Sequence, residues 1–404
     1  MRLPETRAGH DRSNSVEYHY ERKAPSLRVG LLNCDVLVIG CGVVGCAIAY
    51  ELSSAGLSVV GIDAGDPASG ATGASLGVLM GICSRQPSGE VVQLRLKSLE
   101  QFDPLIARLE EDLGRSLPVN RRGILKLLRE EEVTAWQETL AARRQAGYRL
   151  ELLSPAEVGS LQPGLQGDLA GAIYSPQDRQ IQPRLLTQAL VEAAQRRGCR
   201  FFFYQPVQKM QRSPDPPFRL QAVYTPALTF SAGHVVLAAG LGSSPLAEEL
   251  GLQIPLQAVK GQALRIKAAG IPLGPVVSAA DLHLVPLGDG SLWVGATVEF
   301  QATQPEPTLL ALQDLLAHAI RLCPALAEAT LLEHWAGHRP RPLGQRAPVL
   351  GPAPGYVNLF VATGHYRNGV LLAPISAAIL RDLVLKGETA LCDLSAFAPR
   401  PKQG

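Results

Sequence analysis

The order of hydrophobic and polar positions predicts a strand, a helix and a second strand at the start of the folded chain. Residues 35–39 form an apolar run that leads into a glycine cluster, as in a buried parallel strand. Small apolar residues at 46–54 predict a helix, and residues 57–62 predict the second strand. This order is typical of a βαβ unit with a parallel sheet.

The rest of the chain alternates between helical and extended patterns. Helical periodicity predicts helices over residues 90–113, 130–146, 183–197, 308–322 and 370–385. Apolar runs predict strands at residues 124–128, 201–204, 235–240 and 359–362. Between residues 256 and 297, short strands separated by Gly and Pro predict an antiparallel sheet. The pattern therefore predicts an α/β fold, with a Rossmann-like domain and a second, α+β domain built on an antiparallel sheet.

Composition and charge narrow the class of protein. With 404 residues, 46% of them hydrophobic and 18% charged, the chain is typical of a globular enzyme with two or three domain-sized units. The net charge of +2 indicates no nucleic-acid or membrane-surface partner. Seven scattered cysteines without a C-x-x-C pair argue against a disulfide framework and favour a cytoplasmic protein. The longest apolar stretch, residues 36–50, is shorter than the ~20 residues of a membrane helix, so we expect no transmembrane segment.

A glycine fingerprint follows the first strand and opens the first helix. Gly40 would allow the tight turn, Gly42 would let the backbone approach a pyrophosphate, and Gly45 would let helix and strand pack closely. Asp63 ends the second strand, where an acid can hold ribose hydroxyls. Such glycines also occur in ordinary loops, but strand, helix and acid in register indicate dinucleotide binding.

Three further clusters carry candidate chemistry. Residues 70–77 form a small-residue loop, which is either a close approach to a flat ligand or phosphate, or a surface turn. Residues 364–370 form a second Gly-flanked turn between a strand and a helix, which is either an anion-ready site or a plain capping loop. Arg339 offers a fork suited to a carboxylate, and the alternative is a surface Arg beside a Pro-rich turn. We predict no metal site.

In these motifs the sequence resembles the D-amino-acid-oxidase-type FAD-dependent oxidoreductases, and within them the glycine-oxidase branch of thiamine biosynthesis. The resemblance runs from about Cys34 to Leu385. Its markers, in the family's order, are the glycine fingerprint, Gly-Ala-Thr-x-Ala-Ser at 70–75, Tyr-Ser-Pro at 174–176, the strand at 235–240, Lys-Gly-Gln at 260–262, Val-Gly-Ala-Thr at 294–297, Trp-Ala-Gly-x-Arg-Pro at 335–340 and Gly-His-Tyr-Arg-Asn-Gly at 364–369. The last two markers are specific to the glycine-oxidase branch.

The resemblance implies FAD as the cofactor and gives roles to individual residues. At the pyrophosphate it implies Gly40, Gly42, Val43, Val44 and Gly45. Asp63 and Ala64 would hold the adenosine ribose, and Val207 would meet adenine through its backbone. Along the ribityl chain and the flavin it implies Ala71, Thr72, Leu76, Gly77 and Val78. Around the flavin it implies His365, Tyr366, Arg367, Asn368, Gly369, Val370 and Leu371.

The same resemblance concerns the substrate. Arg339 would bind the substrate carboxylate, with Arg367 close by. The sequence departs from the family at two positions of the substrate site. Arg341-Pro342 replaces Gly-Thr, and His283 stands where the family commonly has a Tyr that binds the carboxylate. If the register holds, His283 lines the substrate cavity, is shorter than a Tyr and can gain a charge near neutral pH. We then expect a substrate somewhat larger than glycine, or a glycine affinity that depends on pH between about 6 and 8. The alternative is a hydrogen-bonded polar residue at a strand edge.

The implied reaction is oxidation of a small amino acid, glycine or a D-amino acid, to an imine, with oxygen or another electron acceptor. A D-amino-acid dehydrogenase with a non-oxygen acceptor and a non-catalytic flavin scaffold are the alternatives, and a homo-oligomer is compatible with the sequence. We expect residues 1–33 to form a flexible extension, residues 34–90, 181–245 and 330–395 the FAD-binding domain, and residues 91–180 and 246–329 the substrate domain.

Overall fold

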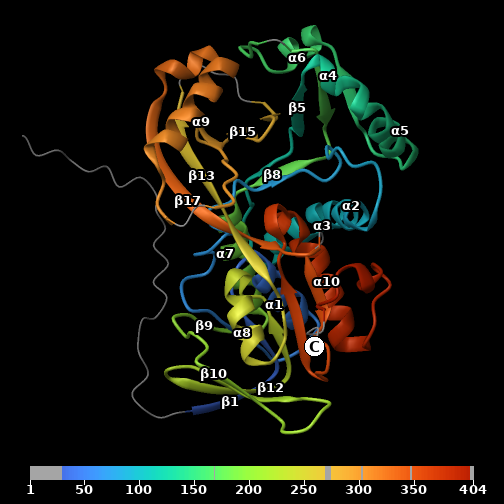
Figure 1. The fold of residues 1–404 in the computed structure, drawn as a ribbon, viewed down its shortest axis with the longest axis vertical. Coiled ribbons are helices and arrows are strands. Elements are labelled where there is room, and N and C mark those ends of the chain that lie inside the picture. Colours follow the sequence, from blue (N-terminus) through green and yellow to red (C-terminus); the bar gives the residue numbers. More distant parts are fainter. Residues whose placement is uncertain (1–29, 168, 269–273, 302–303, 346–347, 401–404) are drawn as a thin grey trace, which may run out of the picture.

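Two large sheets, with helices between and around them, build the molecule. The computed structural model describes residues 30–167, 169–268, 274–301, 304–345 and 348–400. Each large sheet has eight strands, and the two lie towards opposite ends of an elongated shape (Figure 1). The first sheet has a parallel centre and the second is mainly antiparallel, which confirms the predicted α/β class.

The first sheet carries the predicted βαβ unit. Its parallel strands are, in spatial order, β19 (Leu359–Thr363), β12 (Leu228–Leu237), β1 (Gly30–Ile39), β2 (Val59–Ile62) and β9 (Arg200–Phe202). Antiparallel strands extend it: β10 (Lys209–Arg212), β11 (Leu220–Tyr224) and β18 (Val349–Pro352). Strand β1 begins at Gly30 rather than near residue 35, because its first residues pair with β12 from Leu228 onwards. Of the predicted extension, residues 1–29 lie outside the described residues.

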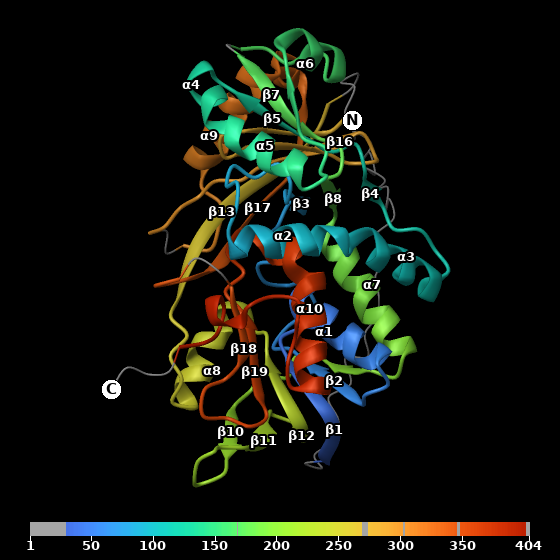
Figure 2. The ribbon, with the colours of Figure 1, turned by 90° about the vertical axis from the view of Figure 1, so that its right-hand side faces the viewer.

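Helices cover both faces of the first sheet. Val36 and Val38 of β1 contribute to one core with α1 (Val43–Ser54), α7 (Pro183–Arg196) and α10 (Gly369–Lys386), which lie together in Figure 2. Leu37 and Ile39 point to the opposite core, which includes residues of α8 (Ser243–Glu249). Alternate residues of one strand thus face two layers of helices, as in a doubly wound fold.

Helix α10 is the most apolar long helix among the described residues. By length and composition the segment Tyr366–Lys386 could cross a membrane, yet 72% of its most apolar window is buried inside the fold. It packs against α1 and α2 (Glu90–Glu100). This burial is what a central core helix requires, because an all-round apolar helix must be covered on every side.

The second sheet has the order β17-β13-β16-β15-β14-β5-β7-β6. Its strands are β5 (Ile124–Leu128), β6 (Glu151–Leu153), β7 (Gly171–Ser175), β13 (Leu256–Lys267), β14 (Val276–Ala279), β15 (Leu282–Pro286), β16 (Ser291–Gly295) and β17 (Thr330–Pro342). All its pairs are antiparallel except β14 with β5. Helix α9 (Leu309–Leu322) shares a core with one face of this sheet, and the other face looks towards the first half of the molecule.

Smaller elements complete the two halves of the molecule. They are the strands β3 (Val78–Leu79), β4 (Val119–Asn120) and β8 (Arg179–Ile181), which form a third sheet, and the helices α3 (Phe102–Leu113), α4 (Glu130–Val133), α5 (Gln137–Gln145) and α6 (Pro155–Leu161). The predicted helices at 90–113 and 130–146 are therefore present, each divided into shorter pieces. Helix α2 crosses above α10 in Figure 2.

A long two-stranded ribbon joins the two halves. Strands β13 and β17 pair from Leu256 with Pro342 to Lys267 with Thr330. One end of the ribbon contacts the short 3₁₀ turns Gly240–Gly242 and Tyr366–Asn368, which follow strands of the first sheet. Strand β17 lies within the segment 330–395 that we assigned to the FAD-binding domain, yet it pairs in the second sheet. The domain limits remain a proposal.

Candidate active site

A large cavity lies between the carboxyl edge of the first sheet and the second sheet. Its volume is about 1350 Å³. The predicted site residues on its wall are Gly40, Gly42, Val43, Val44, Asp63, Ala64, Ala71, Thr72, Leu76, Gly77, Val78, Val207, His283, Arg339, His365, Tyr366, Arg367, Asn368, Gly369 and Val370. Gly45 and Leu371 do not line it. The fold therefore collects residues from distant parts of the chain around one space.

Two positions of the glycine fingerprint have no room for a side chain inside the protein, and the third borders the cavity. Gly40 has φ +106°, which favours glycine, and a Cβ there would lie 2.5 Å from the Ala238 carbonyl oxygen. A Cβ on Gly45 would lie 1.9 Å from the Gly40 carbonyl oxygen, so Gly45 serves the packing of helix on strand. A Cβ on Gly42 would meet only Thr72 Oγ1, at 3.2 Å. Gly42 therefore leaves room on the cavity side rather than inside the protein.

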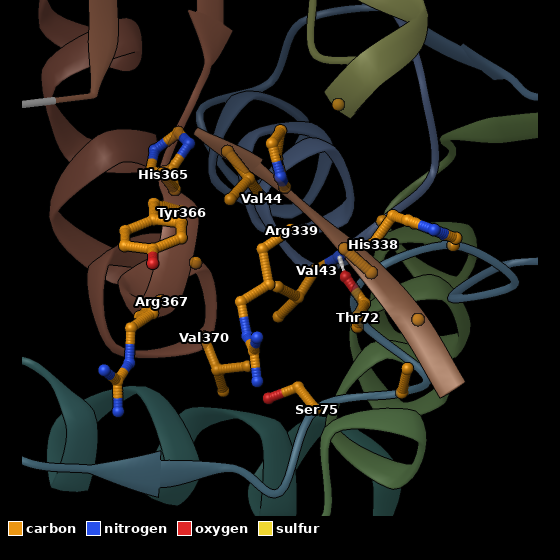
Figure 3. Close-up of a pocket in the computed structure, with 18 of the residues that line it drawn as sticks. Val43, Val44, Thr72, Ser75, His338, Arg339, His365, Tyr366, Arg367 and Val370 are labelled. Carbon is orange, nitrogen blue, oxygen red and sulfur yellow. Dashed lines mark hydrogen bonds between the residues drawn. The ribbon is translucent and has the colours of Figure 1, made fainter. Parts of the chain in front are cut away.

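The start of helix α1 faces this room. The N-cap residue, Gly42, has no side chain that could cap the helix, and the first turn contains no acidic residue. The Val43 N–H donates to Thr72 Oγ1 over 3.1 Å, the bond drawn in Figure 3. The next N–H groups of the first turn and the positive end of the helix dipole suit a phosphate.

Asp63 lies at the end of β2 and ties the fingerprint to the next loop. Its Oδ2 accepts a hydrogen bond from the Cys41 N–H at 2.6 Å, and its Oδ1 accepts one from the Gly65 N–H at 2.9 Å. Burial raises the pKa of Asp63, and the backbone N–H donors oppose that rise. Each carboxylate oxygen keeps a further lone pair, so the acid that braces the loop can also accept from a ribose hydroxyl.

Strand β17 reaches the 70–77 loop through one hydrogen bond and one close contact. The Trp335 Nε1–H donates to the Ala74 carbonyl over 3.0 Å. A Cβ on Gly337 would lie 2.2 Å from the Ala74 Cβ, so only glycine allows this approach. The Trp-Ala-Gly part of the motif therefore docks the strand, and Arg339 follows on the same strand at the cavity wall.

The Arg339 side chain projects into the cavity beside Ser75 and Val370 (Figure 3). Its Nη1 donates to the carbonyl oxygens of Lys260, at 3.2 Å, and Thr297, at 3.0 Å. No carboxylate among the described residues forms an ion pair with it. Burial lowers the pKa of Arg339, and the charge of Arg367 acts in the same direction. A guanidinium fixed by carbonyls and left without a counter-ion is suited to an anionic ligand.

Arg367 differs from Arg339 because it already has an acidic partner. Its Nη1 lies 3.0 Å from Asp281 Oδ1, and its side chain is 39% exposed. The exposed pair contributes little to stability. The pair places one cation and one anion on the wall, and the charges of both act on Arg339.

His283 lines the cavity, on an interior strand of the second sheet. Leu282 and Leu284 belong to the core on the opposite face, as the alternation predicted. The His283 Nδ1 is buried and has no hydrogen-bond partner within the described ranges. Burial, with the charges of Arg367 and Lys126, lowers the pKa of His283 to about 3. The expectation that His283 gains charge near neutral pH is therefore wrong, since the ring is neutral there.

Sequence reasoning missed several polar residues on the wall, among them Arg95 of α2, Lys126 of β5 and Ser278 of β14. It also missed buried Asp178, whose carboxylate accepts from the N–H groups of Gly81, Ile82 and Cys83 at 2.7–2.9 Å and so fixes a loop beside the cavity. Only Lys126 left a visible signal, as one charge in the apolar run 124–128.

The residues that line the cavity fit FAD. The cavity is long enough to touch both the Asp63 loop and the second sheet, the helix start suits a pyrophosphate, and Gly42 leaves space beside it. The turn that includes His365 forms part of the same wall. The Nε2 atom of His365 lies 2.9 Å from Ser376 Oγ, and this hydrogen bond anchors the turn to α10. The residues assigned to individual parts of the cofactor remain proposals.

Comparisons with known proteins agree with this fit. The model of the family "FAD dependent oxidoreductase" matches residues 35–383. Glycine oxidase from Geobacillus kaustophilus is 31% identical over 367 residues, which are 90% of this chain and 96% of that relative. The crystal structure of glycine oxidase from Geobacillus kaustophilus superimposes with a TM-score of 0.85 over 92% of this chain and 100% of that one. Iminodiacetate oxidase from Chelativorans sp. BNC1 superimposes with a TM-score of 0.81 at 25% identity, over 91% of this chain and 100% of that one.

The family model covers most of the chain, and the relatives are covered almost completely. Fingerprint, helix start and cavity supply what a bound dinucleotide needs. The chain therefore belongs to the FAD-dependent oxidoreductase family of D-amino-acid-oxidase type, and FAD is its cofactor.

Proposed function

We propose that the protein oxidises the C–N bond of a small amino acid, glycine or a D-amino acid, and that oxygen accepts the electrons. The observation that carries the proposal is Arg339, a guanidinium without an acidic partner among the described residues, held in a cavity whose other end suits a dinucleotide. The similarity to glycine oxidases over nearly the whole chain supports it.

The chain contributes orientation rather than acid–base chemistry. Arg339 binds the substrate carboxylate through its fork and so fixes the position of the α-carbon. Bound FAD supplies the two-electron oxidant that takes the α-hydrogen as hydride. The amine nitrogen loses a proton and forms a C=N bond, and water hydrolyses this imine to a 2-oxo acid and ammonia.

Two groups on the described part of the wall near Arg339 could be considered as bases, Asp281 and His283. Asp281 is already paired with Arg367, and burial with nearby cations lowers the pKa of His283 to about 3, so His283 does not take up a proton at neutral pH. We therefore propose that the substrate amine binds in its neutral form, after it has given its proton to water. A neutral amine is what hydride loss requires, because its lone pair forms the new double bond.

Purified protein tests the proposal with two measurements. Anaerobic addition of glycine or D-alanine should bleach the flavin absorbance, and aerobic turnover should release one hydrogen peroxide per amino acid. Bleaching without peroxide, with activity only on an artificial acceptor, would indicate the D-amino-acid dehydrogenase. A flavin that no amino acid reduces would support the non-catalytic scaffold instead.

A further inference from the structure

A row of polar side chains crosses the second sheet on its cavity face. In the strand register, Lys126 of β5 is paired with Ser278 of β14, and Ser278 is paired with His283 of β15. All three line the cavity. Residues directly opposite one another in neighbouring strands place their side chains side by side on the same face. The three therefore form one continuous polar strip.

Polar atoms of this strip lack hydrogen-bond or ion-pair partners among the described residues. Ser278 Oγ and His283 Nδ1 are buried atoms without a hydrogen-bond partner in the described part of the chain. The Lys126 ammonium forms no ion pair there either. A buried polar atom without a partner is costly, so native proteins almost always give it one. Side by side, an ammonium, a hydroxyl and a neutral imidazole are the partners that an acidic group would need.

Helix α2 adds a further cation. Arg95 lines the same cavity, and its Nε is buried without a hydrogen-bond partner among the described residues. Burial lowers the pKa of Arg95, and the charges of Arg143 and Arg367 act in the same direction. An arginine among other cations gains most from an anionic ligand, because such a ligand supplies the missing opposite charge.

The charge balance indicates more than one anion on the ligand. Asp63 lies at the fingerprint and Arg184 donates to the Gly73 carbonyl of the 70–77 loop. Apart from these two, the described residues of the wall include five cations, Arg85, Arg95, Lys126, Arg339 and Arg367, and two acids, Glu132 and Asp281. Five minus two leaves three positive charges. A glycine bound by Arg339 removes only one of them and leaves the polar strip without a partner.

We propose that Lys126 and Ser278, with Arg95, form a second anion subsite that receives a second carboxylate of the substrate. The substrate class is an amine that carries two carboxylates, one bound by Arg339 and the other by this subsite. His283 lies between the two in the order of the strands, because β15 stands between β17, which carries Arg339, and β5, which carries Lys126. The inference deepens the proposed oxidation and rests on it for the reaction.

The reaction balances as it does for glycine. The C–H bond next to one carboxylate breaks, the nitrogen loses a proton, and a C=N bond forms. Oxygen accepts the two electrons and two protons and becomes hydrogen peroxide. Water then cleaves the imine into a 2-oxo acid and an amine, or ammonia where the substrate is a primary amine. A secondary amine with a carboxymethyl group on each side and an acidic D-amino acid both meet this description.

The test compares substrates and a non-reactive probe on the purified flavoprotein. The substrates are iminodiacetate, D-aspartate and glycine, and the probe is diglycolate, in which an ether oxygen replaces the amine. Wild-type kcat/KM should be at least about tenfold higher for one of the two diacids than for glycine. The preferred diacid then shows whether the substrate is a secondary amine, as in iminodiacetate, or an acidic D-amino acid, as in D-aspartate. Lys126→Met keeps the length of the side chain without its charge, and it should lower the ratio of diacid to glycine kcat/KM at least about tenfold.

Diglycolate binding gives a readout that does not depend on turnover. Titration with diglycolate should perturb the flavin absorbance, and Lys126→Met should weaken its Kd about tenfold or more. Ser278→Ala, which removes only the hydroxyl, should weaken the Kd about two- to tenfold and serves if Lys126→Met does not fold. The matched control is Lys209→Met, because Lys209 is exposed on β10 of the other sheet.

The outcomes separate the two proposals. Unchanged diglycolate binding and an unchanged substrate ratio in both Lys126→Met and Ser278→Ala would overturn the subsite. Diglycolate binding that depends on Lys126, in a protein whose flavin no amine reduces, would support the subsite and contradict the proposed oxidation. Turnover of glycine alone, with no binding of diglycolate, would keep the oxidation and overturn the subsite.

Discussion

The guanidinium group of Arg339 lies directly over the Cα of Gly261. A Cβ on residue 261 would lie 2.3 Å from Nη2, 2.5 Å from Cζ and 2.6 Å from Nη1 of Arg339. Gly261 is paired with Gly337 in the β13–β17 ribbon, so neither strand carries a side chain at this level. The position of the proposed carboxylate anchor therefore depends on the absence of one methyl group on the neighbouring strand.

Gly261→Ala should displace Arg339 without unfolding the protein. The clashing atoms are the end of a flexible side chain, so the guanidinium can move aside, and we expect the free energy of unfolding to change by only about 1 kcal/mol. We expect kcat/KM to fall about tenfold or more, because the anchor leaves its carbonyl acceptors. Steady-state kinetics and urea denaturation measure the two effects. Gly288→Ala is the control, since a Cβ on Gly288 would meet nothing within 4 Å; equal losses in both variants would contradict this account.

Removal of the Arg339 side chain should separate cofactor binding from substrate binding. We expect Arg339→Ala to keep its flavin spectrum and to lose about a hundredfold or more in kcat/KM, since a charged fork on a carboxylate contributes about 2–4 kcal/mol. Arg339→Lys should recover only part of the activity, because a point charge cannot make two parallel bonds. Full activity of Arg339→Ala would move the anchor to another cation, with Arg341 and Arg367 the first to test.

Gly42 should be required for cofactor retention. Its missing side chain opens onto the cavity at the start of α1, so Gly42→Val places two methyl groups where the pyrophosphate is expected. The variant should fold, as judged by its circular dichroism, and should be purified without the yellow colour of the flavin. Gly159→Ala, on the exposed helix α6, should remain yellow. A yellow Gly42→Val protein would contradict the predicted position of the pyrophosphate.

The neutral state of His283 has a consequence for stability. Burial and nearby cations hold its pKa to about 3 in the folded protein, against about 6.5 when unfolded. Below pH 6.5 the unfolded chain takes up a proton that the folded protein does not, so His283 lowers the free energy of unfolding as the pH falls from about 6.5 towards 3. The slope approaches about 1.4 kcal/mol per pH unit.

His283→Gln keeps a neutral polar group and should remove this dependence. Urea denaturation of both proteins at pH 7.5, 6.5 and 5.5 measures the difference, and wild type should lose more stability than the variant between pH 6.5 and 5.5. Parallel pH profiles would place the His283 pKa near its usual value. The same neutral state predicts that His283→Gln does not change the pH dependence of kcat/KM between 6 and 8.

Local patterns predicted the cofactor half of the molecule well. The fingerprint, Asp63 and the turn at His365 are each defined by neighbours within a few residues, and all of them line one cavity. The burial of Leu282 and Leu284 opposite His283 also followed from simple alternation. These features depend on chain geometry over short distances, which the order of residues reveals directly.

Properties that depend on distant elements were not predictable. Lys126 and Ser278 are neighbours only because β5 and β14 pair in one particular register. Arg95 lines the same cavity from helix α2, which precedes both strands in the sequence. The protonation of His283 was predicted wrongly for the same reason, because its pKa responds to cations on β5, on β17 and in the turn before α10. The sequence of one strand does not show which charges three other elements place around its histidine, so it cannot predict the pKa of that histidine.

The β13–β17 ribbon has a consequence for the energetics of catalysis. The ladder from Leu256 to Lys267 pairs β17, which carries Arg339, with β13 inside the second sheet, and one end of this ribbon contacts the turns that follow strands of the first sheet. To move Arg339 away from these turns, the molecule would have to move both paired strands together rather than one flexible loop. The position of Arg339 is therefore set when the chain folds, and the free-energy cost of ordering it is not repeated in each catalytic cycle.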